Sequence, residues 1–233
     1  PVLVHRAQAL CYAWIYLDDH GLEEIDVQMT YVHLDTEMIK RFRETMTREE
    51  LESWYQRLLD SYHKWLSYQM KWREERNRSM EKLEFPFIYR KGQKEMVAGI
   101  YHAISRKEQI FIQAPTGVGK TMSAVFPAVR SIGEGKAETL FYLTARTITR
   151  TVAQDAFEIL RKNGLLFKTV TITAKEKLCF CEKPECNPET CPYAKGHYDR
   201  INDAVYELWT NEQSFDRETI LRQAEKWQVC PFE

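Results

Sequence analysis

The chain has 233 residues, a formal net charge of −1 and 44% hydrophobic residues, enough for the core of one domain or two small ones. No apolar run approaches the ~20 residues that span a bilayer, and the start of the chain lacks a signal-peptide profile. We therefore expect a soluble, cytoplasmic protein with no membrane partner. The balanced charge excludes a uniformly basic nucleic-acid-binding protein, so any DNA contact has to be local. Because the chain does not begin with Met and ends without a polar tail, we also expect a fragment of a longer protein.

Residues 1–84 are predicted to form a mainly helical α/β segment. Apolar residues recur at helical spacing over 5–19, and the alternation over 25–32 is typical of a strand with one buried face. A capping box at Thr47 predicts a long helix that runs to about residue 81. The proline in 85–88 breaks this helix, and we place a domain boundary after residue 84.

From residue 85 onward, helices and strands alternate, which predicts an α/β fold with a parallel sheet covered by helices on both faces. The expected helices are 91–105, 120–131 and 147–163, and the expected strands are 109–113, 139–143 and 169–173.

The segment 114–121, Ala-Pro-Thr-Gly-Val-Gly-Lys-Thr, follows a predicted strand and opens a predicted helix, the setting of a P-loop. Lys120 would neutralise the β- and γ-phosphates of ATP, and Thr121 would ligate Mg²⁺, so we predict both as catalytic. A glycine-bearing turn without a ligand is disfavoured because the motif and its setting coincide. Ala114 replaces the usual first glycine, a departure common among superfamily 2 helicases. The residues expected to bind the nucleotide beside Lys120 and Thr121 are Thr116, Gly117, Val118 and Gly119.

Two further residues flank this loop in positions that resemble helicase motifs. Gln93 lies about 20 residues before the P-loop and resembles the Q motif that reads adenine; otherwise it is a solvated helix residue. The segment 143–147 ends a predicted strand and resembles motif Ia, where Arg146 could hold a DNA phosphate at a helix start. The alternative makes Thr144 an N-cap and Arg146 a solvent-facing residue.

Five of the six cysteines fall in the final quarter of the chain. Without a signal peptide, a metal site explains them better than disulfides. Zinc and a four-iron cluster both take four soft ligands, so the spacing does not choose between them. The candidate ligands are Cys179, Cys181, Cys186, Cys191 and Cys230.

The order of P-loop, motif Ia, clustered cysteines and a distant Cys-Pro-Phe resembles the XPD/DinG iron–sulfur helicases over 85–233. This resemblance implies a RecA-like P-loop NTPase, with 85–178 as the first part of motor domain 1 and 179–233 as an incomplete cysteine-rich insertion. It also implies a structural [4Fe-4S] cluster beside the DNA path, with Cys181 left as a free thiol in reserve. We expect His197 to be an exposed helix residue. The cluster ligands implied by the family are Cys179, Cys186, Cys191 and Cys230.

Gln8 and Tyr12 lie one turn apart on the first predicted helix and resemble the Gln-x-x-x-Tyr motif that positions DNA in RecB-like nucleases. Residues 1–84 would then end such a nuclease domain, whose metal-binding core precedes Pro1. A plain core helix is the alternative. Glu134 and Lys136 imitate a nuclease Glu-x-Lys, but we reject that reading because no aspartate-bearing strand is arranged before them.

The sequence thus predicts part of an ATP-dependent DNA helicase that acts on single-stranded or forked DNA together with the rest of its polypeptide, a second motor domain and a nuclease core. Residues 1–233 alone should be inert, because they contain no Asp-Glu-x-His or Asp-Glu-Ala-His sequence. The alternative is a zinc-stabilised nucleic-acid-binding module with regulatory nucleotide binding. A P-loop kinase or small GTPase is disfavoured because no lid or base-specificity motif is found.

Overall fold

The computed structural model describes residues 2–145, 147–182 and 185–232. The chain forms two compact units, Pro1–Tyr68 and Gln69–Glu233. Helix α2 (Arg48–Glu81) contributes residues to both, so the division falls inside this helix and not after it. Among the described residues, no helix combines the length and the apolar character needed to cross a membrane.

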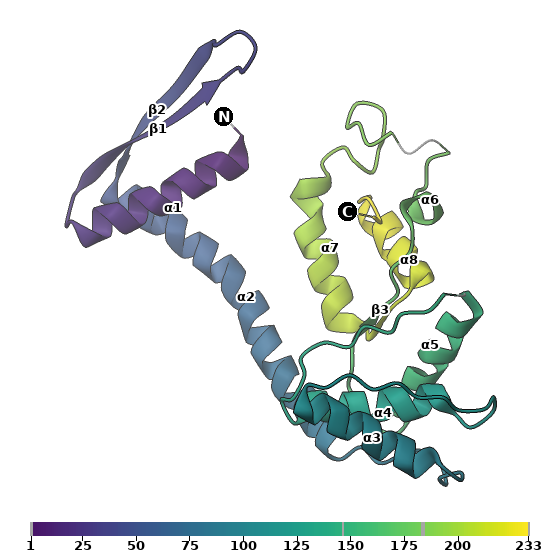
Figure 1. Ribbon diagram of the computed structural model, residues 1–233. Helices are drawn as coiled ribbons and strands as arrows, with labels where there is room; N and C mark the ends of the chain where they lie inside the picture. The colour runs from purple at the N-terminus through teal and green to yellow at the C-terminus, as the bar shows by residue number, and fades with distance from the viewer. Residues whose placement is uncertain (1, 146, 183–184, 233) are drawn as a thin grey trace. The chain divides into compact units, whose positions relative to one another are not determined.

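The first unit packs helix α1 (Leu3–Asp19) and the start of α2 with an antiparallel hairpin, β1 (Glu24–Val32) and β2 (Ile39–Thr47) (Figure 1). The predicted first helix and first strand are confirmed. Strand β2 was not predicted, because charged residues interrupt its apolar pattern and only part of one face is covered. The core of this unit contains Leu10, Ala13, Leu17, Val27 and Leu51.

The predicted capping box at the start of α2 is confirmed. The Glu50 carboxylate accepts from the Thr47 backbone N–H at 3.0 Å, and the Glu50 N–H donates to the Thr47 hydroxyl at 3.3 Å. Two N–H groups at the start of the helix are thereby satisfied reciprocally, which fixes where α2 begins.

In the second unit, helix α4 (Lys120–Gly133) packs with α3 (Gln93–Arg106) and with α5 (Thr147–Lys162). All three helices were predicted to within a few residues. The main core of this unit is built from α4, α5 and the end of α2, and it contains Met80, Leu83, Met122, Val125, Val129, Ile132, Ala156, Phe157, Leu160 and Leu165.

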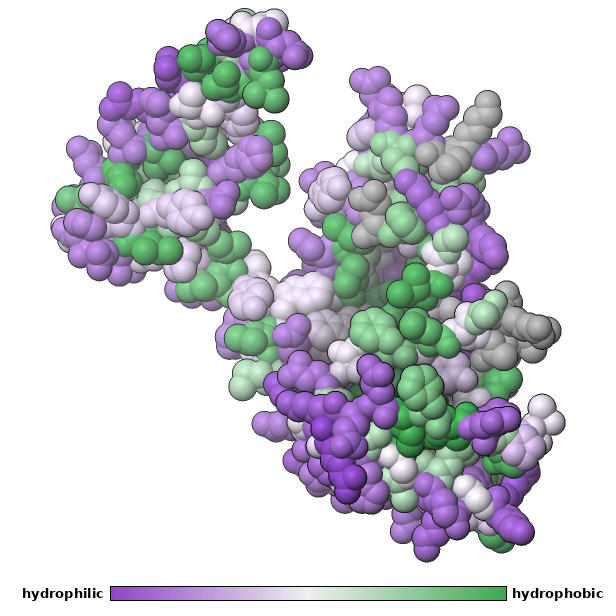
Figure 2. Space-filling view, viewed as in Figure 1, coloured by the Kyte–Doolittle hydropathy of each residue, from purple (hydrophilic) through white to green (hydrophobic). Residues whose placement is uncertain are grey.

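The predicted parallel sheet is not formed by the described residues. Segments 109–113 and 139–143 belong to no strand, and the only parallel pairing found within residues 2–145, 147–182 and 185–232 joins β3 (Thr169–Val170) to β4 (Ser214–Phe215). An apolar pattern predicts an extended chain, but a strand also needs a neighbour for its hydrogen bonds. Phe111 is 94% exposed and Leu143 is 88% exposed. Figure 2 shows hydrophobic residues gathered over the middle of this unit, where the extended segments run.

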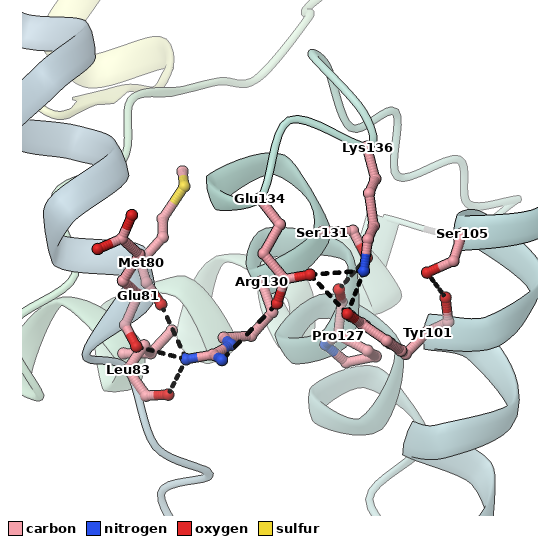
Figure 3. A network of polar contacts seen from close by, with 10 residues as sticks. All are labelled: Met80, Glu81, Leu83, Tyr101, Ser105, Pro127, Arg130, Ser131, Glu134 and Lys136. Atoms are coloured by element: carbon pink, nitrogen blue, oxygen red, sulfur yellow. Dashed lines mark hydrogen bonds and ion pairs between the residues drawn. The ribbon is translucent and has the colours of Figure 1, made fainter.

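Arg130 of α4 holds the end of α2 in place. Its guanidinium donates to the carbonyl oxygens of Met80, Glu81 and Leu83 at 3.3, 2.6 and 3.3 Å (Figure 3). These carbonyls lie in or just beyond the last turn of α2, where helix carbonyls lack partners within the helix. The guanidinium therefore ties the end of α2 to α4.

We expect Arg130→Met to lower the free energy of unfolding by about 1–3 kcal/mol, because three backbone carbonyls, two of them on buried residues, lose a charged donor. Urea unfolding measures this loss. Arg106→Met, at an exposed position in the last turn of α3, is the control and should have little effect. Equal stability of the two variants would contradict the bracing role.

The rejected nuclease pair, Glu134 and Lys136, is engaged in a structural network beside Arg130 (Figure 3). The Lys136 ammonium lies 2.6 Å from the Glu134 carboxylate, and the Tyr101 hydroxyl donates to the same carboxylate at 2.5 Å. Lys136 and Tyr101 together hold the pKa of Glu134 below its usual value.

The C-terminal part of this unit is a hairpin of α7 (His197–Asn211) and α8 (Arg217–Trp227), preceded by the short helix α6 (Lys175–Leu178). Lys168 joins the hairpin to α2: its ammonium donates to the carbonyls of Trp209 and Glu212 and lies 4.3 Å from the ring centre of Trp72. Burial and the nearby Arg161 lower the pKa of Lys168 to about 8.

This lowered pKa predicts a pH-dependent stability. Between pH about 8 and about 10.5 the unfolded chain holds a proton on Lys168 that the folded chain has released. The free energy of unfolding should therefore rise across this window as pH increases. Comparison with Lys168→Met isolates the contribution, since the variant should show a flatter profile in urea unfolding at several pH values. If the free energy of unfolding changed with pH in the same way in the wild type and in Lys168→Met, Lys168 would not be the source of the pH dependence.

Candidate nucleotide and cysteine sites

The P-loop segment turns into α4 through two glycines with positive φ. Gly117 has φ +85°, and Gly119, the N-cap of α4, has φ +79°. Such angles strain other L-residues, and the first N–H groups of α4, which follow directly, lack partners within the helix. The Lys120 ammonium donates to the carbonyls of Ala114 and Pro115, each at 2.9 Å. The loop therefore has backbone angles suited to a phosphate-binding loop, and the Lys120 side chain is hydrogen-bonded to the loop itself.

Gln93 is only 4% exposed and lies against this loop, so the reading as a solvated helix residue does not fit its burial. Its carboxamide oxygen accepts from the Arg90 N–H at 3.0 Å, and the Arg90 guanidinium donates to the Gly117 carbonyl. Arg90 was not predicted, although it stands in the same Arg-Lys-Gly-Gln stretch. The two side chains brace the P-loop; adenine reading by Gln93 stays a prediction.

The contact between Gln93 and Gly119 predicts the effect of Gly119→Ala. A Cβ there would stand 2.7 Å from the Gln93 amide nitrogen, in addition to the cost of a positive φ, about 1–2 kcal/mol. We expect a lower melting temperature and weaker ATP binding. Gly135→Ala is the matched control, since it has φ +72° and nothing within 4 Å of its added Cβ. Gly135→Ala should lower stability but leave ATP affinity unchanged. Equal ATP affinity of the two variants would contradict the role of the Gln93–Gly119 contact in nucleotide binding.

Tyr142, the residue just before the motif Ia segment, lies near the P-loop. Its hydroxyl lies 3.4 Å from the Thr121 hydroxyl, which is the predicted Mg²⁺ ligand. Arg146, the predicted DNA contact, lies outside the described residues. Its role stays a prediction.

The five C-terminal cysteines line one cavity of about 100 Å³. Two contacts bring Cys179 and Cys181 to Cys191: the ring of Phe180 stacks on Tyr193 with centroids 4.5 Å apart, and the sulfurs of Cys181 and Cys191 are 3.9 Å apart. Cys181, expected in reserve, is thus close to a predicted ligand, and Cys186 is the exposed member of the set.

The thiols in this cavity influence one another. Hydrogen bonding with Cys191, burial and the nearby Cys179 raise the pKa of Cys181 to about 11. Within the described part of the chain, no three Cys, His, Asp or Glu side chains are close enough to hold a single metal ion. The donor set nevertheless suits a soft metal centre, because several thiols surround one space and ligand thiols lose their protons when they bind.

His197 differs from its prediction as an exposed helix residue. Its side chain is 4% exposed and lines the cysteine cavity, and Nδ1 accepts the Cys230 backbone N–H at 3.1 Å. The prediction was wrong because it took this position for a solvent-facing one within a longer helix, whereas α7 begins at His197 itself.

On α1, Gln8 and Tyr12 are exposed, and the Gln8 amide donates to the Tyr12 hydroxyl at 3.2 Å. The core of the unit takes other residues of this helix, including Leu10 and Leu17. The pair therefore does not serve as core, and its DNA contact stays a prediction.

Comparison with protein families bears on the nucleotide site. The matching segment begins at Arg90, includes Gln93 and the whole P-loop, and ends just after Cys186. Residues 90–187 match the DEAD/DEAH box helicase family. A helicase domain of this family has the RecA-like P-loop NTPase fold, which agrees with the glycine-bearing loop that leads into α4 at Lys120. Residues 1–89 and 188–233 lie outside the matched segment.

A relative with a described activity supports the helicase match over a short stretch. A probable ATP-dependent helicase of Methanocaldococcus jannaschii is 43% identical over 49 residues, which are 21% of this chain and 7% of that protein. The chain therefore aligns with only a small part of that helicase. No solved structure matches the chain.

Proposed function

We propose that this chain is part of an ATP-dependent DNA helicase, with residues 85–178 as the first part of its motor domain. The observation that carries the proposal is the start of α4, where Lys120 follows a left-handed Gly119 and the buried Gln93 lies against that glycine. This arrangement lies within the segment that matches the helicase family.

The chemistry follows from the residues at the loop. Backbone N–H groups of 116–119 and the positive end of α4 would bind the phosphates, and Lys120 would leave its carbonyl partners to neutralise them. Thr121 would ligate Mg²⁺, whose charge offsets that of the β- and γ-phosphates. Binding needs only these parts, whereas hydrolysis also needs an acidic residue that orders water and an arginine from a second motor domain.

Steady-state ATP hydrolysis by the full-length protein, with and without single-stranded DNA, tests the function. We expect DNA to stimulate hydrolysis by the full-length protein, while residues 1–233 bind ATP without turnover. Sustained hydrolysis by residues 1–233 alone would contradict the division of roles. Stimulation by RNA and not by DNA would contradict the choice of nucleic acid.

For residues 179–233 the proposal includes a structural [4Fe-4S] cluster held by Cys179, Cys186, Cys191 and Cys230. The several thiols around one cavity suit a soft metal centre with cysteine ligands. When bound, the cluster would cross-link the distant Cys230 to the loop before α7. Iron, sulfide and zinc contents of oxygen-free preparations test this; zinc alone, without broad absorbance near ~400 nm, would contradict it.

One distance favours the second candidate, a zinc-stabilised nucleic-acid-binding module. The 3.9 Å between the sulfurs of Cys181 and Cys191 is near the ~3.8 Å edge expected for thiolates around tetrahedral zinc with bonds of ~2.3 Å. In that case Cys181 is a ligand. The same metal analysis separates the two candidates.

For residues 1–84 we propose the end of a RecB-like nuclease domain in which Gln8 and Tyr12 contact DNA. The exposed, hydrogen-bonded pair on α1 supports this role. Gln8→Ala and Tyr12→Ala should weaken DNA binding by the full-length protein in a fluorescence anisotropy titration, and unchanged affinity would contradict the contact.

A further inference from the structure

We propose that His197 and Arg200 form a clamp that positions Cys230 for metal binding. The proposal rests on the metal site described above and adds two residues of α7 that bind no metal themselves. Its central contact is the 3.1 Å hydrogen bond from the Cys230 backbone N–H to Nδ1 of His197.

The clamp holds a cysteine that is far in sequence from the other candidate ligands. Cys230 follows α8, whereas Cys179, Cys186 and Cys191 all precede α7, so the whole hairpin separates the last thiol from the others. Thiols that are far apart in the sequence need fixed backbone positions before they converge, because a flexible end loses entropy on binding. The first turn of α7 supplies those fixed positions.

Arg200 holds the backbone just before Cys230. Its Nε donates to the Trp227 carbonyl at 2.9 Å, and Nη2 donates to the carbonyls of Gln228 and Lys195 at 2.6 and 2.8 Å. These acceptors lie at the end of α8 and immediately before α7. One guanidinium thus joins the two ends of the hairpin, and Gly196 leaves it room, since a Cβ there would stand 2.7 Å from Nη1.

The core of the hairpin supports the same path. Val229, next to Cys230, is buried with Ala204 and Ala224. The backbone of Cys191 is also fixed, because its carbonyl accepts from the N–H groups of Ala194 and Lys195 at 3.2 and 3.1 Å. Only a short turn joins Cys191 to His197, so a bond from His197 to Cys230 brings both cysteines to the same cavity.

The hydrogen bond also defines what the imidazole does. Nδ1 acts as an acceptor, so the proton of the neutral ring lies on Nε2. Because Nδ1 already has a partner, it is not free to bind a metal. We therefore assign His197 as a positioning residue, in the manner of the outer partners that orient metal ligands.

Substitutions at His197 separate positioning from ligation. The side-chain oxygen of Asn lies close to where Nδ1 lies in His, so His197→Asn keeps an acceptor for the Cys230 N–H, whereas His197→Leu removes it. We expect His197→Leu to lower metal affinity by about 10- to 100-fold in chelator competition, and His197→Asn to stay near the wild type. His102→Leu, at an exposed position of α3, is the control and should not differ from the wild type.

A second readout does not need the metal. Amide hydrogen exchange at Cys230 in metal-free protein should be slow in the wild type and in His197→Asn, and fast in His197→Leu. Unchanged exchange and unchanged metal affinity in His197→Leu would overturn the clamp. Loss of metal from His197→Asn with a protected Cys230 amide would also overturn it and identify the imidazole as a ligand.

The two measurements test two different claims. If the wild-type protein binds no metal, both the cluster and the positioning role of His197 are overturned. A protected Cys230 amide in that protein would show that the hydrogen bond to His197 exists and serves only the fold.

Discussion

Lys120→Met should weaken ATP binding by about 10- to 100-fold, because the phosphates lose a charged hydrogen-bond donor. In the free protein the ammonium donates to the Ala114 and Pro115 carbonyls at 2.9 Å, and both hydrogen bonds are exposed to solvent. Water can replace these bonds, so the variant should keep its stability. Calorimetric titration with Mg²⁺-ATP measures affinity, and thermal unfolding measures stability.

Lys162→Met is the control for this substitution. Lys162 is exposed in the last turn of α5, so its loss changes the net charge equally without touching the P-loop. ATP affinity should stay at the wild-type value. Equal losses in the two variants would mean that general electrostatics, and not a specific phosphate contact, controls binding.

Cys191→Ser should reduce the metal content per chain by at least about tenfold, because a ligand is lost and not only its support. The sulfur of Cys191 lies 3.9 Å from that of Cys181, and its backbone begins the turn before α7. Cys191 therefore links the cysteines before it to the α7–α8 hairpin. Without metal, the link between the loop 179–191 and Cys230 is lost. We therefore also expect faster proteolysis of this part of the chain.

Variants of the other cysteines decide which thiols are ligands. Cys186→Ser should lose metal as Cys191→Ser does, Cys181→Ser should retain it, and Cys11→Ser on α1 serves as the control. The reverse result, with Cys181 required and Cys186 dispensable, would contradict the four-cysteine assignment and favour the zinc reading. Iron and zinc contents measured on the same samples distinguish those cases.

The sequence predicted helices α1 to α5 well, because several of them carry local signals, whereas α6 and α8 were not predicted. The Thr47 capping box and the P-loop glycines before α4 both act within a few residues. The sheet was not predictable in the same way. Segments 109–113 and 139–143 have the pattern of buried strands, but pairing depends on neighbours that pattern alone cannot supply, and the described residues contain none for them.

The sites show the same division between local and long-range information. Lys120 and Thr121 were recognisable because the P-loop is contiguous in sequence. Arg90 and Arg200 were missed because they act on backbone carbonyls, which any residue can offer. His197 was misplaced because its partner, Cys230, is brought to it only by the α7–α8 hairpin.

Calorimetric titration of residues 1–233 with ATP in the presence of Mg²⁺ tests the nucleotide site most directly. We expect a single saturable site that Lys120→Met weakens and that Lys162→Met leaves unchanged. The resemblance of Gln93 to the Q motif also implies a preference for ATP over GTP. Absence of saturable binding, or affinity unaffected by Lys120→Met, would contradict the proposal that this chain is part of an ATP-driven motor.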